Sequence, residues 1–269
     1  MTQTNKPLAV VTGASNGIGL ELARKFAQNG FDLLIASRGK GLDEAQQTLQ
    51  ALGAQVECAA VDLATYEGVE QLYSAFRALN RPVDAIAINA GVGVGGSFVP
   101  GTEAETTLES ELNLIQINVV SVVHLAKLFS RDMVAQERGR MLLTSSISGT
   151  SPVPFEAVYG ASKAFVRSFG NAIGNEMKGT GVSVTVLMPG PTETNFFHRA
   201  GEDDTQVGSG KKNDPALVAQ QGFNALMAGQ AEVYGGGPEV EQEGEGPNRT
   251  ESEQEKAERH RQMSEPGSA

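Results

Sequence analysis

The chain has 269 residues, a net charge of −11 and 40% apolar residues. This length allows one large domain or two small ones, and the apolar fraction supports a buried core, which excludes a wholly disordered chain. The negative charge repels phosphate, so nucleic acid is not expected as the main partner. The single Cys58 excludes an internal disulfide framework, and three scattered His residues predict no metal site.

The sequence predicts neither a membrane span nor a secretory signal. No run approaches about 18 consecutive apolar residues, the length that a membrane helix needs. The segment from Met1 to Lys6 is polar and lacks the order of charge, apolar run and small-residue cleavage site of a signal peptide. We therefore expect a cytoplasmic protein and discount the glycosylation sequon Asn248-Arg249-Thr250.

Short apolar segments alternate with longer segments of helical periodicity up to about residue 188. The expected strands are Leu8–Thr12, Asp32–Ser37, Gln55–Val61, Ala85–Asn89, Arg140–Ser145 and Ser183–Met188. The expected helices are Gly17–Asn29, Gly41–Leu52, Tyr66–Leu79, Leu108–Gln136, Val158–Lys178 and Pro215–Ala228. This alternation predicts an α/β fold, a single doubly wound parallel sheet with helices on both faces. In such sheets ligands bind beyond the carboxyl ends of the strands.

The last part of the chain differs in composition from the rest. Residues 239–269 hold nine Glu against four Lys or Arg and lack Ile, Leu, Phe and Tyr. Such a segment buries little apolar surface by itself. We therefore expect one domain over residues 1–238, whose motifs below indicate a dinucleotide-binding catalytic domain, and an acidic extension over residues 239–269. The extension should be flexible or loosely docked, with one polar helix over Glu251–Met263.

A glycine-rich turn follows the first expected strand, in the sequence Gly13-Ala-Ser-Asn-Gly17-Ile-Gly19. Glycines let the backbone approach a pyrophosphate closely, and the following helix offers free N–H groups and partial positive charge. Its position at the start of an alternating β/α series favours dinucleotide binding over a plain turn. The residues expected to contact the dinucleotide here are Gly13, Ser15, Asn16, Gly17, Ile18 and Gly19.

The ends of the next strands carry further candidate contacts. The second strand ends at Ser37-Arg38 without the acidic residue that binds a ribose 2′-hydroxyl in NAD-selective sites. The planar Arg38 guanidinium suits a 2′-phosphate, which favours NADP(H) over NAD(H), although the nearby Lys40 could be the true partner.

The third and fourth strands also end in candidate site residues. In Asp62-Leu63, the carboxylate could accept a hydrogen bond from an adenine amino group or could cap the following helix. In Asn89-Ala90-Gly91, small residues would let a flat ligand lie close to the backbone.

A tyrosine and a lysine stand four residues apart in Tyr159-Gly-Ala-Ser-Lys163. On a helix they share one face, and a nearby cation lowers the pKa of a phenol, which makes Tyr159 a candidate general acid or base. Ser146 follows the fifth strand at the ligand-binding edge, where its hydroxyl could hold a substrate oxygen. Asn118 sits in an apolar helix, where its amide needs partners. It could hold a water in a proton relay, or it could be a structural Asn whose hydrogen bonds are satisfied inside the protein, which would be the preferred interpretation without the other motifs.

Together these motifs resemble the short-chain dehydrogenase/reductase family over about residues 6–230. The matching segments are TGASNGIG (12–19), NAG (89–91), Asn118, Ser146, YGASK (159–163) and PGPTET (189–194). The resemblance implies a Rossmann-like domain that binds NAD(H) or NADP(H). It places the family's catalytic set on Asn118, Ser146, Tyr159 and Lys163, with Tyr159 and Lys163 also touching the cofactor. It places the adenine-contacting acid on Asp62, and the nicotinamide-contacting residues on Pro189, Gly190, Thr192 and Thr194.

The chain departs from this family pattern near its end. Family members usually close with a seventh strand and a short apolar C-terminus that joins subunits, whereas here Tyr234-Gly-Gly-Gly-Pro238 runs into the acidic extension. This puts the seventh strand and a tetramer in doubt. The helices Leu108–Gln136 and Val158–Lys178 remain candidate faces for a homodimer or homotetramer.

The expected activity is hydride transfer between NADPH and a small, largely apolar carbonyl or alcohol substrate. Residues that could line the substrate site, or could equally be core, are Val92, Val94, Phe98, Val153, Phe155, Phe196 and Phe197. The polar segment Gly201–Lys212 is expected to be a mobile lid or a solvated loop, and His198 is expected to be exposed. Two alternatives remain open: a regulator that binds NADP without turnover, and an interaction protein that uses the acidic extension.

Overall fold

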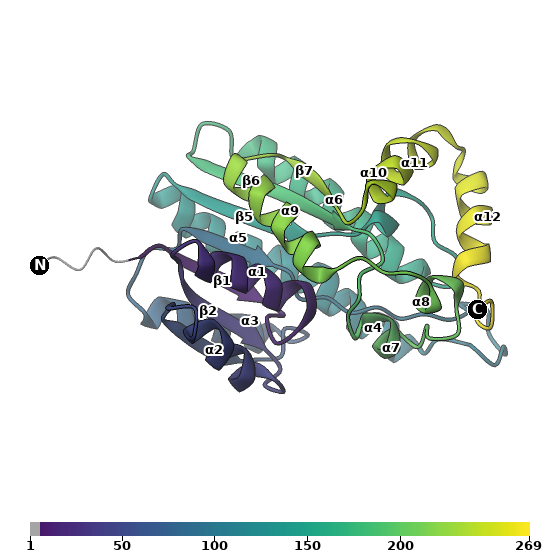
Figure 1. Ribbon diagram of the computed structural model, residues 1–269, viewed down its shortest axis with the longest axis horizontal. Coiled ribbons are helices and arrows are strands. Elements are labelled where there is room, and N and C mark those ends of the chain that lie inside the picture. Colours follow the sequence, from purple (N-terminus) through teal and green to yellow (C-terminus); the bar gives the residue numbers. More distant parts are fainter. Residues whose placement is uncertain (1–5) are drawn as a thin grey trace, which may run out of the picture.

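A seven-stranded parallel sheet in the order β3-β2-β1-β4-β5-β6-β7 forms the centre of the computed structural model, which describes residues 6–269 (Figure 1). The strands are β1 (Leu8–Thr12), β2 (Asp32–Ser37), β3 (Val56–Ala60), β4 (Ala85–Ile88), β5 (Gly139–Thr144), β6 (Val182–Pro189) and β7 (Glu232–Gly235). The first six agree with the expected strands to within one residue at each end. The predicted doubly wound α/β fold is confirmed.

Helices cover both faces of the sheet, as runs of buried strand residues require. The helices of the body are α1 (Gly17–Gln28), α2 (Leu42–Gln50), α3 (Tyr66–Ala78), α4 (Leu108–Ile115), α5 (Ser121–Ala135), α6 (Ala157–Glu176), α7 (Phe196–Ala200), α8 (Gln206–Ser209) and α9 (Pro215–Ala228). On one face α1, α2 and α9 pack together, with the Phe26 and Phe223 rings edge to face at 5.2 Å. On the other face α3, α5 and α6 contribute to a second core, in which the Phe76 and Phe129 rings lie 5.1 Å apart.

The long helix expected over Leu108–Gln136 is interrupted by a π-helical turn, η1 (Gln116–Val120), between α4 and α5. This turn contains Asn118, and π turns of this kind occur frequently at functional sites. Residues 108–135 are long and apolar enough to cross a membrane by length and composition, but half of their most apolar stretch is buried inside the protein. A core helix shows the same properties.

The doubt about a seventh strand was wrong. β7 pairs in parallel with β6, in the register Val186 to Glu232 through Pro189 to Gly235. An ion pair between Arg167 of α6 and Glu232, at 2.8 Å, fixes the start of this strand. The glycines after Tyr234 lie at and beyond the strand's end, so they do not prevent pairing. A four-residue strand is simply too short to stand out as a pattern.

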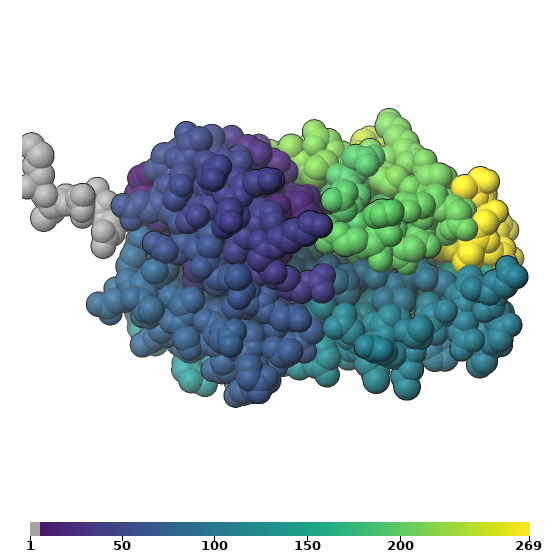
Figure 2. All heavy atoms as spheres, turned by 90° about the horizontal axis from the view of Figure 1, so that it is seen from below, coloured from purple at the N-terminus to yellow at the C-terminus, as the bar shows by residue number. Residues whose placement is uncertain are grey.

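The acidic extension is helical in the structure. It forms α10 (Pro238–Glu245), α11 (Pro247–Thr250) and α12 (Glu253–Ser264), where one polar helix was expected. The last helix begins with a capping box between Ser252 and Glu255. Figures 1 and 2 show α12 in yellow at one end of the molecule, the end far from β1. There it contacts α8, which belongs to the green part of the chain.

One face of α12 docks on the body through residues spaced four apart. Lys256, His260 and Ser264 are buried on this face. The His260 ring lies 2.8 Å from the Ser151 hydroxyl, and the Arg261 guanidinium stacks 5.0 Å from the centre of the Phe155 ring. Docking thus relies on hydrogen bonds and stacking, with few apolar side chains. Residues 1–5 of the predicted polar N-terminal segment lie outside the described residues.

Because α12 is docked on the body, its backbone amides should be protected from hydrogen exchange. We expect amide hydrogen exchange over Glu253–Ser264 to be at least about tenfold slower than in a free chain, as for a docked helix. The variant His260→Ala loses the bond to Ser151 and should speed this exchange. The matched control Glu258→Ala changes an exposed residue of the same helix. Exchange mass spectrometry that finds this segment fully exchanged at the first time point would favour a flexible tail.

Candidate active site

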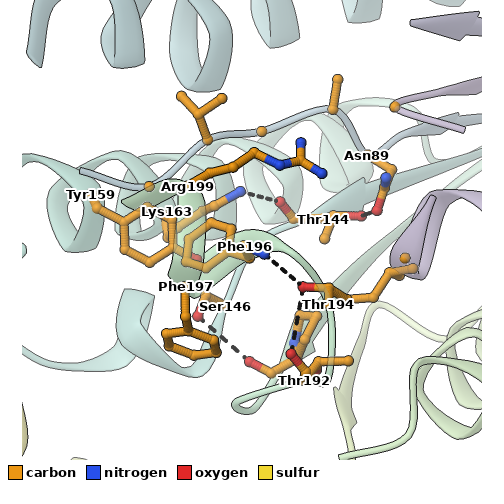
Figure 3. A pocket seen from close by; sticks show the side chains of 18 of the residues that line it. Asn89, Thr144, Ser146, Tyr159, Lys163, Thr192, Thr194, Phe196, Phe197 and Arg199 are labelled. Atoms are coloured by element: carbon orange, nitrogen blue, oxygen red, sulfur yellow. Dashed lines mark hydrogen bonds between the residues drawn. The ribbon is translucent and has the colours of Figure 1, made fainter. Parts of the chain in front are cut away.

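A single cavity of about 1090 Å³ lies beyond the carboxyl ends of the strands. It collects every residue that the sequence analysis selected for catalysis or cofactor binding except Asn118, whose side chain is buried beneath the cavity wall. The selected residues that line the cavity are Gly13, Ser15, Asn16, Gly17, Ile18, Gly19, Ser37, Arg38, Asp62, Leu63, Asn89, Ala90, Gly91, Ser146, Tyr159, Lys163, Pro189, Gly190, Thr192 and Thr194. Figure 3 shows part of this wall at close range.

The glycine-rich turn folds into a cradle at the start of α1. Gly13 and Gly17 have φ values of +69° and +56°, in the region that favours glycine. A Cβ atom on Gly19 would lie 2.2 Å from the carbonyl oxygen of Gly13, so only glycine fits there. The cap residue Asn16 makes no side-chain hydrogen bond to the first turn of α1, and that turn has no acidic residue. Its N–H groups therefore remain available to an anionic group such as a pyrophosphate.

Asn89 ties together the ends of three neighbouring strands. Its amide nitrogen donates to the carbonyl oxygen of Thr12 at 3.2 Å, and its amide oxygen accepts from the Thr144 hydroxyl at 3.1 Å. The Thr12 hydroxyl in turn accepts from the backbone N–H groups of Asn89 and Ala90, both at 3.0 Å. These bonds hold the ends of β1, β4 and β5 in place beneath the cavity floor. The sequence analysis missed the roles of Thr12 and Thr144.

The far end of the cavity carries two exposed cations, Arg38 and Lys40, as expected for an anionic ligand. Asp62 also lines this end, and its carboxylate accepts a hydrogen bond from the N–H of Ala64 at 3.0 Å. The cap of α3 is Thr65, whose hydroxyl accepts from Gly68 at 3.0 Å. The alternative that Asp62 caps this helix is therefore wrong.

Ser146, Tyr159 and Lys163 converge on one side of the cavity. Tyr159 and Lys163 lie one turn apart on α6, and the Lys163 ammonium is 5.7 Å from the centre of the Tyr159 ring. Figure 3 shows the Lys163 ammonium bonded to the Thr144 carbonyl oxygen, at 3.0 Å. The Ser146 hydroxyl accepts from the N–H of Ser148 at 3.1 Å, and it acts to lower the pKa of Tyr159. The Ser–Tyr pair is thus preorganised by α6 and by the turn after β5.

Asn118 reaches this group through the backbone of the loop after β4. Its amide oxygen accepts from the N–H of Val92 at 3.0 Å, and its amide nitrogen donates to the Val92 carbonyl at 2.9 Å and to the Ser162 hydroxyl at 3.1 Å. The intervening Gly91 makes room, because a Cβ there would lie 3.1 Å from the Lys163 ammonium. Asn118 therefore fixes the loop that faces Lys163.

Burial shifts the pKa values of Lys163 and Tyr159. It lowers the pKa of Lys163 to about 8, so the ammonium stays largely protonated at neutral pH. Burial, with the charge of Glu156, raises the pKa of Tyr159 above its usual range, while the Ser146 hydroxyl acts in the opposite direction. The expectation that Lys163 lowers the Tyr159 pKa is therefore wrong: the pKa is raised, and Lys163 is not among the groups that shift it. Tyr159 therefore holds its proton at neutral pH and suits a general acid.

The loop after β6 supplies the remaining wall. The Thr192 hydroxyl donates to the Gly190 carbonyl at 2.8 Å, and the Thr194 hydroxyl accepts from the N–H of Phe196 at 3.2 Å. The Phe196 ring lies 5.2 Å from the Tyr159 ring, measured between centres (Figure 3). Arg199, which the sequence analysis missed, donates to the side chain of Asn16 in the glycine-rich turn at 3.1 Å.

The wall near Phe196 is mixed in character. Of the apolar candidates, Val92, Val94, Val153, Phe196 and Phe197 line the cavity, but Phe98 and Phe155 do not. Several polar or charged residues that no sequence pattern indicated also line it. They include Glu156, Glu243, His260 and Ser264, and the apolar Met263 lies beside them. The acidic extension thus forms part of the cavity wall.

Two further expectations concern the segment after α7. The segment 201–212 contains α8, and Glu202 and Thr205 in it are buried, which a solvated loop would not show. His198 is exposed as expected, and its ring lies 2.7 Å from the Asp203 carboxylate. Across residues 6–269, no group of three or more His, Cys, Asp or Glu is arranged to hold a metal ion.

The buried Glu202 predicts a pH-dependent stability. Burial and the adjacent Glu156 raise its pKa to about 9, against about 4.5 in an unfolded chain. Between these values the folded protein binds more protons than the unfolded one. The free energy of unfolding should therefore fall as pH rises, by up to about 1.4 kcal/mol per pH unit for one proton.

The variant Glu202→Gln removes this titration. Denaturant melts should show it gaining stability over the wild type as pH rises from 5 to 8. The exposed control Glu258→Gln should follow the wild type. Parallel pH profiles of Glu202→Gln and the wild type would show that Glu202 is already ionised in the folded state.

Comparison with known proteins agrees with this geometry. The family model described as short chain dehydrogenase matches residues 7–205. The very-long-chain 3-oxoacyl-CoA reductase of Mycosarcoma maydis is 34% identical over 196 residues, which are 68% of this chain and 53% of the relative. The chain therefore spans about half the length of that relative. An NADP-dependent 3-hydroxy acid dehydrogenase of Salmonella typhi is 29% identical over 215 residues, which are 79% of this chain and 84% of the relative.

Solved structures show the same likeness. A short-chain dehydrogenase from Sphingobium yanoikuyae in complex with NADPH has a TM-score of 0.76 and 26% identity, covering 85% of this chain and 87% of the other. A short-chain dehydrogenase/reductase from Burkholderia phymatum in complex with NAD has a TM-score of 0.78 and 25% identity, covering 93% and 94%. With its glycine cradle and its Ser–Tyr–Lys group at the carboxyl edge of the sheet, the chain belongs to the short-chain dehydrogenase/reductase family and is an NAD(P)-dependent oxidoreductase.

Proposed function

We propose that this enzyme reduces the carbonyl group of a small, largely apolar ketone or aldehyde with NADPH, and oxidises the corresponding alcohol in the reverse direction. The observation that carries the proposal is the convergence of Ser146, Tyr159 and Lys163 in the cavity that also contains the glycine cradle. Substrate and dinucleotide can therefore meet beside Tyr159. The comparisons lend no support to a non-catalytic regulator or to an interaction protein.

The cavity fits a dinucleotide. The glycine cradle and the free N–H groups of α1 suit a pyrophosphate, and Asp62 and Leu63 suit the adenine end. Pro189, Gly190, Thr192 and Thr194 face the region where Tyr159 lies and would hold the nicotinamide. The bound reduced dinucleotide supplies a hydride ion, which the carbonyl carbon accepts.

The chain's own residues would manage the proton. Ser146 would hold the carbonyl oxygen, and Tyr159 would donate its phenolic proton to that oxygen as the new C–H bond forms, so that the product is a neutral alcohol. The ammonium of Lys163 would stabilise the resulting phenolate and bond the nicotinamide ribose. Asn118, by fixing the loop at Val92, would position the water through which the phenol regains its proton.

Preference for NADP(H) over NAD(H) rests on the cations at the far end of the cavity. Arg38 directly follows β2, where an acidic residue would select NAD, and Lys40 lies beside it. The two solved relatives carry NADPH in one case and NAD in the other, so the likeness alone leaves the choice open. A planar guanidinium matches a 2′-phosphate better than an ammonium does, which favours Arg38 as the main contact.

A homodimer or homotetramer and a cytoplasmic location complete the proposal. The helices named as dimer faces carry exposed apolar side chains, including Leu112 on α4, Val123 on α5 and Phe165 on α6. Phe165 stacks on Phe169 at 5.6 Å, which adds to the apolar surface of α6. Exposed apolar side chains on these helices are what a subunit interface would bury.

Removal of the Tyr159 hydroxyl tests the catalytic assignment. Tyr159→Phe should lower kcat for a verified ketone at least about 100-fold, the low end for a lost general acid. The matched control Tyr66→Phe removes the hydroxyl of a tyrosine that is 68% exposed and should leave turnover unchanged. Steady-state NADPH oxidation measures both variants. Near-normal turnover by Tyr159→Phe would refute its role.

Removal of the Arg38 side chain tests the cofactor preference. Arg38→Ala should weaken NADPH binding at least about tenfold, the worth of a lost charge-assisted bond of about 1.4 kcal/mol, while NADH binding changes little. Lys40→Ala serves as the comparison and should have the smaller effect. Fluorescence titration gives both dissociation constants. A larger NADPH loss for Lys40→Ala would move the phosphate contact to Lys40, and equal losses for NADPH and NADH would argue against any 2′-phosphate contact.

A further inference from the structure

Two buried carboxyl groups meet at the cavity wall beside Tyr159. Glu156 lies immediately before α6 and lines the cavity, and Glu202, only 2% exposed, lies behind it after α7. Gly95 provides the space for Glu202, since a Cβ at Gly95 would lie 2.3 Å from the Glu202 Cγ. The proposed hydride transfer uses neither carboxyl group.

The protein provides no cation for this pair. Within residues 6–269, neither carboxyl has an ion-pair partner, and no positive charge counters the raised pKa of either group. Glu156 has one weak contact, from the Ser264 hydroxyl at 3.4 Å. Both Glu202 oxygens are buried without a donor, so this carboxyl can form a hydrogen bond only with Glu156, and only when one of the two holds a proton.

An uncompensated buried carboxyl pair attracts any cation that can reach it. Like charges side by side in a desolvated site are costly, and a positive group that replaces the shared proton relieves this cost. Glu156 lines the cavity and Glu202 does not, so a ligand that approaches the pair meets Glu156 first. Nearby, His260 is held neutral because burial lowers its pKa, and Arg259 is engaged with Glu243 and Glu251.

The pair is also coupled to the reaction centre. Glu156 and Tyr159 stand one helical turn apart at the start of α6, and both carboxyl charges raise the pKa of Tyr159. A ligand cation at Glu156 would therefore lie on the side of the cavity that holds Tyr159, and the rest of the ligand would lie against Phe196, whose ring is 5.2 Å from the Tyr159 ring. It would also offset the negative field that Tyr159 experiences.

We propose that Glu156, supported by Glu202, binds a basic nitrogen of the substrate, so that the preferred substrates are ketones or aldehydes with an apolar body and an ammonium group. This inference rests on the proposed carbonyl reduction and names its substrate class. The same pair disfavours substrates that bear a carboxylate, because it would place like charges together. The competing role is structural: a neutral acid pair that only ties the segment after α7 to the start of α6.

Matched acetophenones provide the test. Their ring carries aminomethyl, ethyl or carboxylate at the meta or para position, which varies the charge and covers two distances from the carbonyl. The wild type should reduce the better aminomethyl isomer with kcat/KM at least about tenfold above its ethyl counterpart, and the carboxylate should be the poorest. In Glu156→Gln the aminomethyl-to-ethyl ratio should fall towards one. The control Glu258→Gln, the same change on the exposed face of α12, should keep the wild-type ratio.

The outcomes distinguish failure of the proposed ammonium site at Glu156 from failure of the proposed carbonyl reduction. A wild-type ratio of one or below overturns the inference and favours the structural role, whatever the variants do. A high ratio that survives in Glu156→Gln also overturns it, because the nitrogen then binds elsewhere. If the wild type reduces none of these ketones with NADPH or NADH, the proposed carbonyl reduction itself fails, and the inference fails with it.

Discussion

The site depends on the reversal of strand order at the centre of the sheet. From β1 the chain crosses to β2 on one side, whereas β4 lies on the other side of β1. The segments that follow β1 and β4 consequently lead to helices on opposite faces, which opens a crevice between them. The bonds of Asn89 to Thr12 and Thr144 fix this opening. The glycine cradle and the Ser–Tyr–Lys group lie on either side of it.

The electrostatic potential in this crevice depends on which charged side chains line it and how deeply they are buried, more than on the net charge of the chain. The whole chain is acidic, yet the walls expected to face an anionic dinucleotide carry Arg38, Lys40, Lys163 and Arg199. On the substrate side the uncompensated charges are negative, and they help to hold the Tyr159 proton. A phenol that retains its proton suits reduction at neutral pH. In the reverse direction, Lys163 and a substrate cation would both ease loss of that proton.

Sequence patterns predicted the features that depend on local chemistry. Residue type alone marks the glycine-rich turn, and a four-residue spacing marks Tyr159 and Lys163. Runs of apolar residues mark six of the strands. The π turn at Asn118 adds one residue to a helical turn and leaves the apolar pattern almost intact. β7 is too short to show a pattern. Glu156 and Glu202 lie far apart in the sequence and meet only through folding. The acidic extension docks through hydrogen bonds and stacking, and amino-acid composition alone does not predict such contacts.

The proposed function requires that this cavity transfers hydride from a nicotinamide to a carbonyl carbon. The most direct test uses NADPH deuterated at C4 on one face or the other, with the ethyl-substituted acetophenone as acceptor and mass spectrometry of the product alcohol. We expect one deuterium on the carbinol carbon from one of the two labelled cofactors and none from the other. An alcohol whose carbinol hydrogen comes from solvent, or no reduction of any ketone tried, would contradict it.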